Sequence, residues 1–271
     1  MFKIRHGFSR LFFFQVETKK DFEYFSRMMK MDESAIVWTT NGDQPLQLKK
    51  DVATKECHSR WSPYDFNGGT VLAIAGEDFV VLAADTRLST GYSILSRHES
   101  KVHQLTPKTL LGCPGSYNDV VQLRGTLSIR TQMYEHDNGR APTTENLAQL
   151  LSNTLYQRRF FPLYAFCILA GLDKDGKGAV YSYDALGSHQ RLSRGAMGTG
   201  GHLMIPLLDN LVEHESRSDP KKNLTLEETK EIMKDAFVTA GERDIYTGDS
   251  VELFVLTKDG LQKETFALKM D

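Results

Sequence analysis

The clearest pattern in the chain is a pair of apolar runs joined by a short polar turn. Residues 71–75 and 79–84 flank the polar triplet 76–78, which predicts a tight hairpin of two strands. The runs are apolar at nearly every position, so both faces of the hairpin are expected to be covered. Two glycines precede the hairpin, and a carboxylate and a guanidinium group follow it. These flanking residues are Gly68, Gly69, Asp85 and Arg87.

Further along the chain, short apolar runs predict more strands. The predicted strands cover residues 101–105, 109–113, 164–172, 179–183, 188–193, 251–257 and 261–268. Residues 195–201 contain four glycines and are expected to form a turn before a helix.

Helical spacing of apolar residues predicts four helices in two adjacent pairs, over residues 116–137, 142–155, 203–211 and 225–237. Ser116 with Asp119, and Thr225 with Glu228, are typical of helix starts. Paired helices that do not alternate with single strands disfavour a doubly wound parallel sheet. The predicted fold class is therefore α+β, a four-layer αββα sandwich of two antiparallel sheets.

The composition is that of an ordinary globular protein and excludes several classes. A length of 271 residues allows one large domain with an extension, and a net charge of -2 gives no footprint for nucleic acid. No apolar run reaches the length of a membrane span. Residues 1–59, of which 31–59 are polar and lack a sustained period, are expected to be a flexible or removed leader, and residues 60–271 the domain.

No cofactor or metal site is predicted. Three widely spaced cysteines suit a reducing compartment and form neither a disulfide framework nor a zinc site. The eight histidines lack the spacing of metal ligands. The glycine-rich residues 198–201 lack the lysine that a phosphate-binding loop requires.

Several motifs together carry a family resemblance over residues 67–268. They are Gly68-Gly69-Thr70, Ala84-Asp85-Thr86-Arg87, Lys101, and the segments 112–115, 198–201 and 243–249. In these motifs the chain resembles the proteasome β subunits, which belong to the N-terminal-nucleophile hydrolases and share the sandwich fold predicted above. Residues 60–64, 66–78, 158–162 and 176–182 most closely resemble one non-catalytic member.

The resemblance implies a chemistry for the active members of the family. An N-terminal threonine, exposed by cleavage after a glycine, attacks the peptide carbonyl with its hydroxyl, and its free amine acts as the base. A lysine lowers the proton affinity of the nucleophile, an aspartate orients the lysine, and a backbone N–H stabilises the oxyanion.

Spacing decides which residue occupies the nucleophile position. Active members place the aspartate sixteen residues after the threonine and the lysine sixteen further on. Counting from Gly69 reaches Asp85 and Lys101, whereas counting from Thr70 misses both by one. A shift of one residue turns a side chain to the opposite face of a strand, so Thr70 is expected to face away from Lys101.

The resemblance thus implies a degenerate site, with glycine at the nucleophile position and a retained frame around it. The residues of this site are Gly69, Asp85, Lys101, Gly115, Thr199, Asp244 and Thr247. Four of these residues also have a purely structural interpretation. Asp85 and Lys101 could form a salt bridge, Gly115 a turn between a strand and a helix, and Thr199 a helix cap. Asp249 departs from the glycine that is usual in the family.

The function implied is that of a non-catalytic β subunit of the proteasome core particle, the chamber for ATP- and ubiquitin-dependent protein degradation. The expected partners are other β subunits in a seven-membered ring, the opposing β ring, the α rings and unfolded polypeptide substrates, in the cytoplasm and nucleus. No nucleic acid or membrane partner is expected. Two alternatives stay open: an active threonine endopeptidase that uses Thr70, and a free-standing binding protein with a degenerate hydrolase fold.

Overall fold

The computed structural model describes residues 2–4, 12–14, 62, 64–214, 217–221 and 223–270. The chain divides into two compact units, Met1–Trp61 and Ser62–Asp271. In the first unit, β1 (Phe2–Ile4) pairs with β2 (Phe12–Phe14) in antiparallel fashion. The rest of the predicted leader lies outside the described residues, and its boundary after residue 59 stays a prediction.

The second unit contains two five-stranded antiparallel sheets. The first has the order β12-β3-β4-β13-β14, and the second the order β11-β10-β9-β8-β7. The strands of the first sheet are β3 (Thr70–Ala75), β4 (Phe79–Asp85), β12 (Arg194–Gly198), β13 (Ser250–Thr257) and β14 (Gly260–Ala267). Those of the second are β7 (Val102–Thr106), β8 (Thr109–Gly112), β9 (Ile168–Leu172), β10 (Gly178–Tyr183) and β11 (His189–Leu192).

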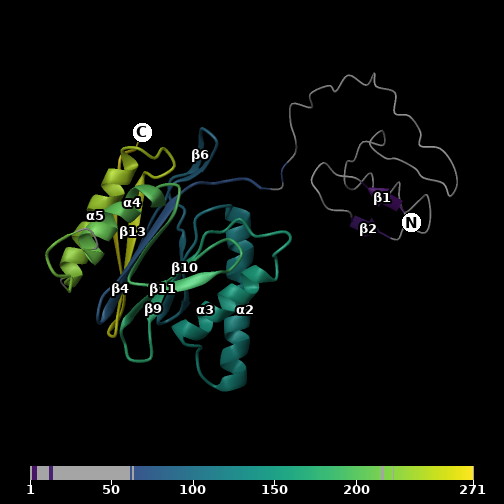
Figure 1. Cartoon of the computed structure of the whole chain (residues 1–271), viewed down its shortest axis with the longest axis horizontal. Helices are drawn as coiled ribbons and strands as arrows, with labels where there is room; N and C mark the ends of the chain where they lie inside the picture. The colour runs from purple at the N-terminus through teal and green to yellow at the C-terminus, as the bar shows by residue number, and fades with distance from the viewer. Residues whose placement is uncertain are drawn as a thin grey trace. The chain divides into compact units, whose positions relative to one another are not determined.

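The predicted hairpin β3–β4 lies inside the sandwich, as the apolar runs indicated. Val71 and Ala73 join the core between the two sheets, while Leu72 and Ile74 pack in the core under the second helix pair. Figure 1 shows these layers, with α4 and α5 outside one sheet and α2 and α3 outside the other. The four-layer αββα sandwich is confirmed.

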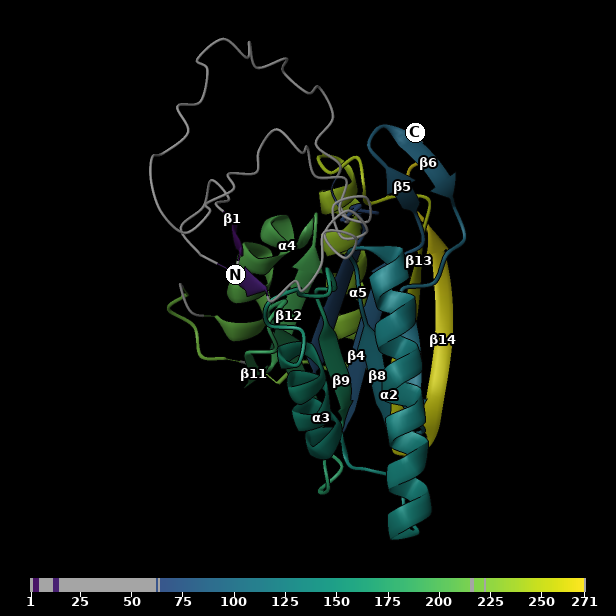
Figure 2. The same cartoon turned by 90° about the vertical axis from the view of Figure 1, so that its right-hand side faces the viewer.

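The helices agree with the predicted positions. They are α2 (Tyr117–Asn138), α3 (Thr144–Tyr156), α4 (Gly201–Leu208) and α5 (Leu226–Gly241), and a π-helical turn, η2 (Asp209–Glu213), extends α4. Thr225 and Glu228 form the predicted reciprocal cap of α5. Figure 2 shows α2 and α3 side by side across the second sheet.

The predicted cap of α2 is only partly right. Ser116 is the N-cap residue, but its side chain makes no cap hydrogen bond. Instead, the N–H of Tyr117 donates to Oδ1 of Asn67 at 2.8 Å, and Asp119 accepts a hydrogen bond from the N–H of Tyr164. A residue fifty positions earlier therefore satisfies the first turn of the helix.

Two predicted elements differ from the structure, and one hairpin was missed. The glycine-rich segment 195–201 is not simply a turn, because β12 pairs with β3 from Arg194 to Gly198. The strand expected over residues 164–172 begins only at Ile168. The hairpin of β5 (Leu88–Thr90) and β6 (Ser93–Ser96) was not predicted, and its strands are short and irregularly paired.

Cys113 and Cys167 are both buried free thiols, with their Sγ atoms 2.9 Å apart, while Cys57 lies outside the described residues. None of the helices in the described part of the chain is long and apolar enough to cross a membrane.

Candidate functional site

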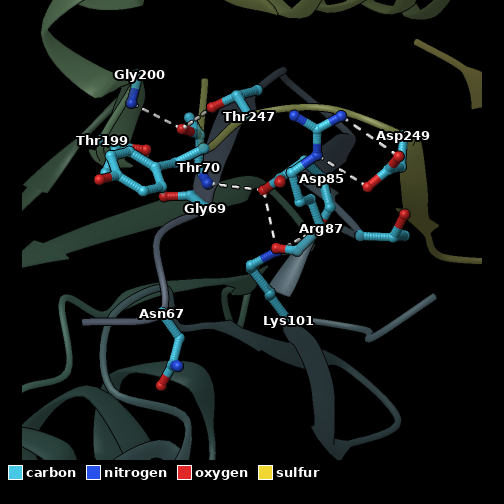
Figure 3. Close-up of polar contacts among 12 residues, drawn as sticks. Asn67, Gly69, Thr70, Asp85, Arg87, Lys101, Thr199, Gly200, Thr247 and Asp249 are labelled. Carbon is cyan, nitrogen blue, oxygen red and sulfur yellow. Dashed lines mark hydrogen bonds and ion pairs between the residues drawn. The ribbon is translucent and has the colours of Figure 1, made fainter. Parts of the chain in front are cut away.

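The candidate site lies where the chain enters β3, and Gly69 is at its centre (Figure 3). Gly69 has a φ of 90°, in the region that favours glycine. A Cβ atom on this residue would lie 2.0 Å from Cε of Lys101. The lysine side chain therefore fills the space that a side chain at position 69 would need, and residue 69 offers no hydroxyl or thiol to the ammonium group.

The structure brings Asp85 and Lys101 together, at the spacing that the sequence indicated. Nζ of Lys101 lies 3.2 Å from Oδ1 of Asp85 and donates to the backbone carbonyls of Asp85 at 2.9 Å and Arg87 at 2.6 Å. Both side chains are buried. Burial raises the pKa of the Asp85 carboxyl, and the Lys101 ammonium and the N–H of Thr70 oppose that rise.

The hydroxyl of Thr70 is directed away from this pair and is fully engaged. It accepts a hydrogen bond from the N–H of Gly200 at 2.8 Å and lies 2.7 Å from the hydroxyl of Thr247. Thr247 in turn donates to Oδ2 of Asp244 at 2.7 Å. Because the carboxylate only accepts, Thr247 donates to Asp244 and Thr70 must donate to Thr247.

Thr70 also lacks a free amine that could serve as a base. Its nitrogen is a peptide N–H, which donates to Oδ1 of Asp85 at 2.7 Å. The residue is completely buried. In this arrangement Thr70 has neither the exposed hydroxyl nor the amine that the family mechanism requires.

The structure places Thr199, Asp244 and Thr247 together, on the opposite side of β3 from Lys101. Thr199 is not the cap of α4, because the N-cap residue is Gly200. Instead, its hydroxyl donates to Oδ2 of Asp244 at 2.5 Å, and its N–H donates to the carbonyl of Gly69 at 3.0 Å. These residues hold the backbone at residue 69 and the hydroxyl of Thr70, and among the described contacts none of their hydrogen bonds reaches Lys101.

Gly115 lies two residues before α2, where the resemblance placed an oxyanion donor. Its φ is 131°, and a Cβ atom would lie 2.3 Å from the carbonyl oxygen of Tyr164, so the backbone there requires glycine. Its carbonyl accepts a hydrogen bond from the N–H of Asn67 at 3.1 Å. The segment that precedes Gly69 is therefore bound directly to this turn.

Asn67 is a residue of the site that sequence reasoning missed. Its Nδ2 donates to the carbonyl of Ser89 at 3.1 Å and to Oγ1 of Thr90 at 3.1 Å, and its Oδ1 caps α2. Its backbone carbonyl accepts from the N–H of Ser89 at 3.1 Å. An asparagine next to two glycines was a usable signal, since asparagine commonly binds nearby backbone groups where the chain turns.

Asp249 has a structural role in place of the usual glycine. It has a φ of 67° and is buried, and its carboxylate accepts hydrogen bonds from Arg87 at 2.9 and 3.3 Å and from Arg97. Burial raises the pKa of the Asp249 carboxyl, but the hydrogen bonds from the two arginines outweigh this effect and hold the pKa below its usual value. The ion pair with Asp249 also holds Arg87 in place, and the backbone carbonyl of Arg87 accepts a hydrogen bond from Lys101.

No group of three or more histidine, cysteine, aspartate or glutamate side chains able to hold a metal ion is found among the described residues.

Comparison with known proteins places this geometry in a family. A family model described as proteasome subunit matches residues 65–256. The chain belongs to the proteasome subunit family. The resemblance predicted from the sequence is thereby confirmed.

Several named relatives are similar to this chain over most of its length. Proteasome subunit beta type-1 of Drosophila melanogaster is 48% identical over 217 residues, which cover 79% of this chain and 92% of the relative. The protein of the same name from Arabidopsis thaliana is 48% identical over 79% of this chain and 98% of its own length. Proteasome subunit beta type-6 of Saccharomyces cerevisiae is 40% identical, over 83% and 98%. Of the two family functions considered above, the non-catalytic subunit fits these relatives better than the catalytic one.

Proposed function

We propose that the chain is a non-catalytic, structural β subunit of the proteasome core particle, which forms part of the wall of the proteolytic chamber. The observation that carries this proposal is the contact between Gly69 and Lys101. The lysine and its aspartate keep the arrangement of a catalytic pair, but the residue beside them has no nucleophile. The hydroxyl of Thr70, the nearest alternative, is buried and bound to Gly200 and Thr247.

The proposal includes the partners that the family resemblance implies. The subunit takes a place in a seven-membered β ring, contacts the opposing β ring and the α rings, and faces unfolded polypeptide substrates in the chamber. It acts in the cytoplasm and the nucleus and needs no cofactor.

The ordered contacts of Asn67 support the retention of residues ahead of Gly69 in the mature subunit. Hydrogen bonds from Asn67 reach α2, the turn at Gly115 and the β5–β6 hairpin. Cleavage at Gly69 would remove all of them. We therefore expect the mature chain to begin near Arg60, after a neighbouring subunit has trimmed the leader.

Intact-mass analysis of the native particle tests this expectation. It should find this chain in a large assembly, with an N-terminal residue close to Arg60. A mature chain that begins at Thr70 would contradict the non-catalytic function, and a stable monomer in cells would support the free-standing binding protein instead.

Substitution of Thr70 separates the structural function from the catalytic alternative. Thr70→Ala should leave every peptidase activity of the assembled particle unchanged, because among the described residues the hydroxyl forms hydrogen bonds only with Gly200 and Thr247. The fold should lose about 1–3 kcal/mol, since the buried N–H of Gly200 is left without its acceptor. Thr70→Ser, which keeps the hydroxyl, is the matched control. Loss of one peptidase activity in Thr70→Ala particles of normal composition would establish the catalytic alternative.

A further inference from the structure

A run of six exposed residues begins at the last residue of α3 and has the residue types of an interface. Residues 156–161, which we call the 156–161 loop, are all exposed, and Phe160 and Phe161 are 89% and 58% exposed. Large aromatic side chains are usually buried, so two adjacent phenylalanines in solvent indicate a surface that is covered in the functional state.

The charged residues of the loop also favour an interface. Arg158 and Arg159 stand immediately before the two phenylalanines and are both exposed. Within the part of the chain that the structure describes, neither guanidinium group forms an ion pair or a hydrogen bond. Arginine and aromatic residues together are enriched at the centres of protein–protein interfaces, where they contribute most of the binding energy.

The backbone of the loop is held in place before any partner binds. The N–H groups of Arg158, Arg159 and Phe161 each donate to the carbonyl three residues earlier, at 2.9–3.0 Å. A surface that is ordered in advance loses less conformational entropy on binding than a mobile one.

A ladder of aromatic rings connects the loop to the segment ahead of Gly69. Phe161 stacks on Tyr64 with ring centroids 5.6 Å apart, and Tyr64 packs against Tyr164, which contacts Phe66 edge to face. The hydroxyl of Tyr64 also donates to the carbonyl of Pro162 at 3.0 Å. Phe66 is the neighbour of Asn67, so the ladder leads from the surface to the candidate site.

We propose that the 156–161 loop, together with Tyr64, is a docking surface for a neighbouring subunit of the particle, which receives the two phenylalanines in an apolar pocket bordered by carboxylates. This inference rests on the proposed function, because Tyr64 belongs to the surface only while the residues ahead of Gly69 are retained. On this inference, the retained segment has a structural role, because Tyr64 packs against the exposed ring of Phe161.

A photo-crosslinking residue, p-benzoylphenylalanine, at position 160 of the assembled particle tests the partner directly. We expect a crosslink to one defined subunit, within a segment that contains aspartate or glutamate. Crosslinks only to an unfolded substrate, or to nothing, would overturn the proposal.

Matched pairs of variants test the chemistry. Phe160→Ser with Phe161→Ser should lower the share of this chain recovered in complete particles by about tenfold, whereas Phe160→Leu with Phe161→Leu should keep it near the original value. Arg158→Glu with Arg159→Glu should also lower it, and the lysine pair should retain most of it. The melting temperature of the isolated chain should stay the same in the two arginine variants, whose side chains are exposed. Both phenylalanine variants lose the stacking of Phe161 on Tyr64, so their melting temperatures should agree with each other. Normal incorporation of the serine pair would refute the docking surface.

The outcomes distinguish this inference from the proposed function. A mature chain that begins at Thr70 would contradict the proposed function. A mature chain that begins before Tyr64, together with normal incorporation of the serine pair, would contradict the docking surface alone.

Discussion

Lys101→Met is expected to destabilise the fold by about 3–5 kcal/mol, which is the usual effect of removing one partner from a buried ion pair. The Asp85 carboxylate is completely buried, and Lys101 lies 3.2 Å from its Oδ1. Without the ammonium group, the carboxyl must either stay charged in an apolar environment or take up a proton. The carbonyls of Asp85 and Arg87 would also lose their shared donor.

Denaturant unfolding of the isolated chain measures this effect, and Lys230→Met is a closely matched control. The Lys230 side chain is also nearly buried, but its partner Glu264 is 42% exposed and can be hydrated when the lysine is lost. The control should therefore cost no more than about 1 kcal/mol. If the two substitutions lower the free energy of unfolding equally, the Asp85–Lys101 pair contributes no more to stability than an exposed ion pair.

A second variant separates the charge from the packing. Asp85→Asn in the Lys101→Met background keeps an oxygen that accepts from the N–H of Thr70 but removes the uncompensated charge. It should recover a substantial part of the lost stability. No recovery would mean that the lost lysine contacts with the backbone carbonyls, rather than the buried charge, account for the effect.

Local patterns were sufficient to predict much of the fold, and the family resemblance was needed to predict the centre of the site. The continuous apolar runs of β3 and β4 predicted strands covered on both faces, and the reciprocal cap at Thr225 predicted the start of α5. The spacing that the family resemblance implies, counted from Gly69, located the buried pair of Asp85 and Lys101. Such features depend on neighbouring residues or on a fixed count along the chain.

The features that were missed depend on partners far away in the sequence. β12 is a strand because it pairs with β3, more than one hundred residues earlier, although its glycines suggest a turn. Asn67 binds both Tyr117 and Gly115, and only the family resemblance, not a local pattern, had put Thr199 and Asp244 in one site. No local pattern could predict that these groups meet, because the tertiary fold alone brings them together.

Gly69→Ala is expected to cost roughly 2–6 kcal/mol, although it adds only one methyl group. About 1–3 kcal/mol comes from the positive φ of 90°, which a residue with a Cβ rarely adopts. A similar amount comes from Lys101, which must move away from the new atom and leave buried acceptors unsatisfied. The backbone cannot shift easily to avoid this contact, because the N–H of Thr199 holds the carbonyl of residue 69.

Gly125→Ala is the control, since a Cβ at that position of α2 meets no atom within 4 Å. Alanine within a helix should stabilise the chain by up to about 1 kcal/mol, so the two glycines should give effects of opposite sign in the same unfolding measurement. If Gly69→Ala unfolds at the same denaturant concentration as the original chain, residue 69 and Lys101 are not in the contact described here.

Gly69→Thr extends the argument from stability to function. It restores a hydroxyl at the proposed nucleophile position and recreates a glycine–threonine junction beside Lys101 and Asp85. The strain and the contact that penalise alanine apply equally to threonine, while Asn67 still binds the preceding segment to Gly115. We therefore expect lower incorporation into particles and no new peptidase activity. A self-cleaved chain with threonine at its N-terminus would show instead that the surrounding site is fully competent and that the missing hydroxyl alone makes it inactive.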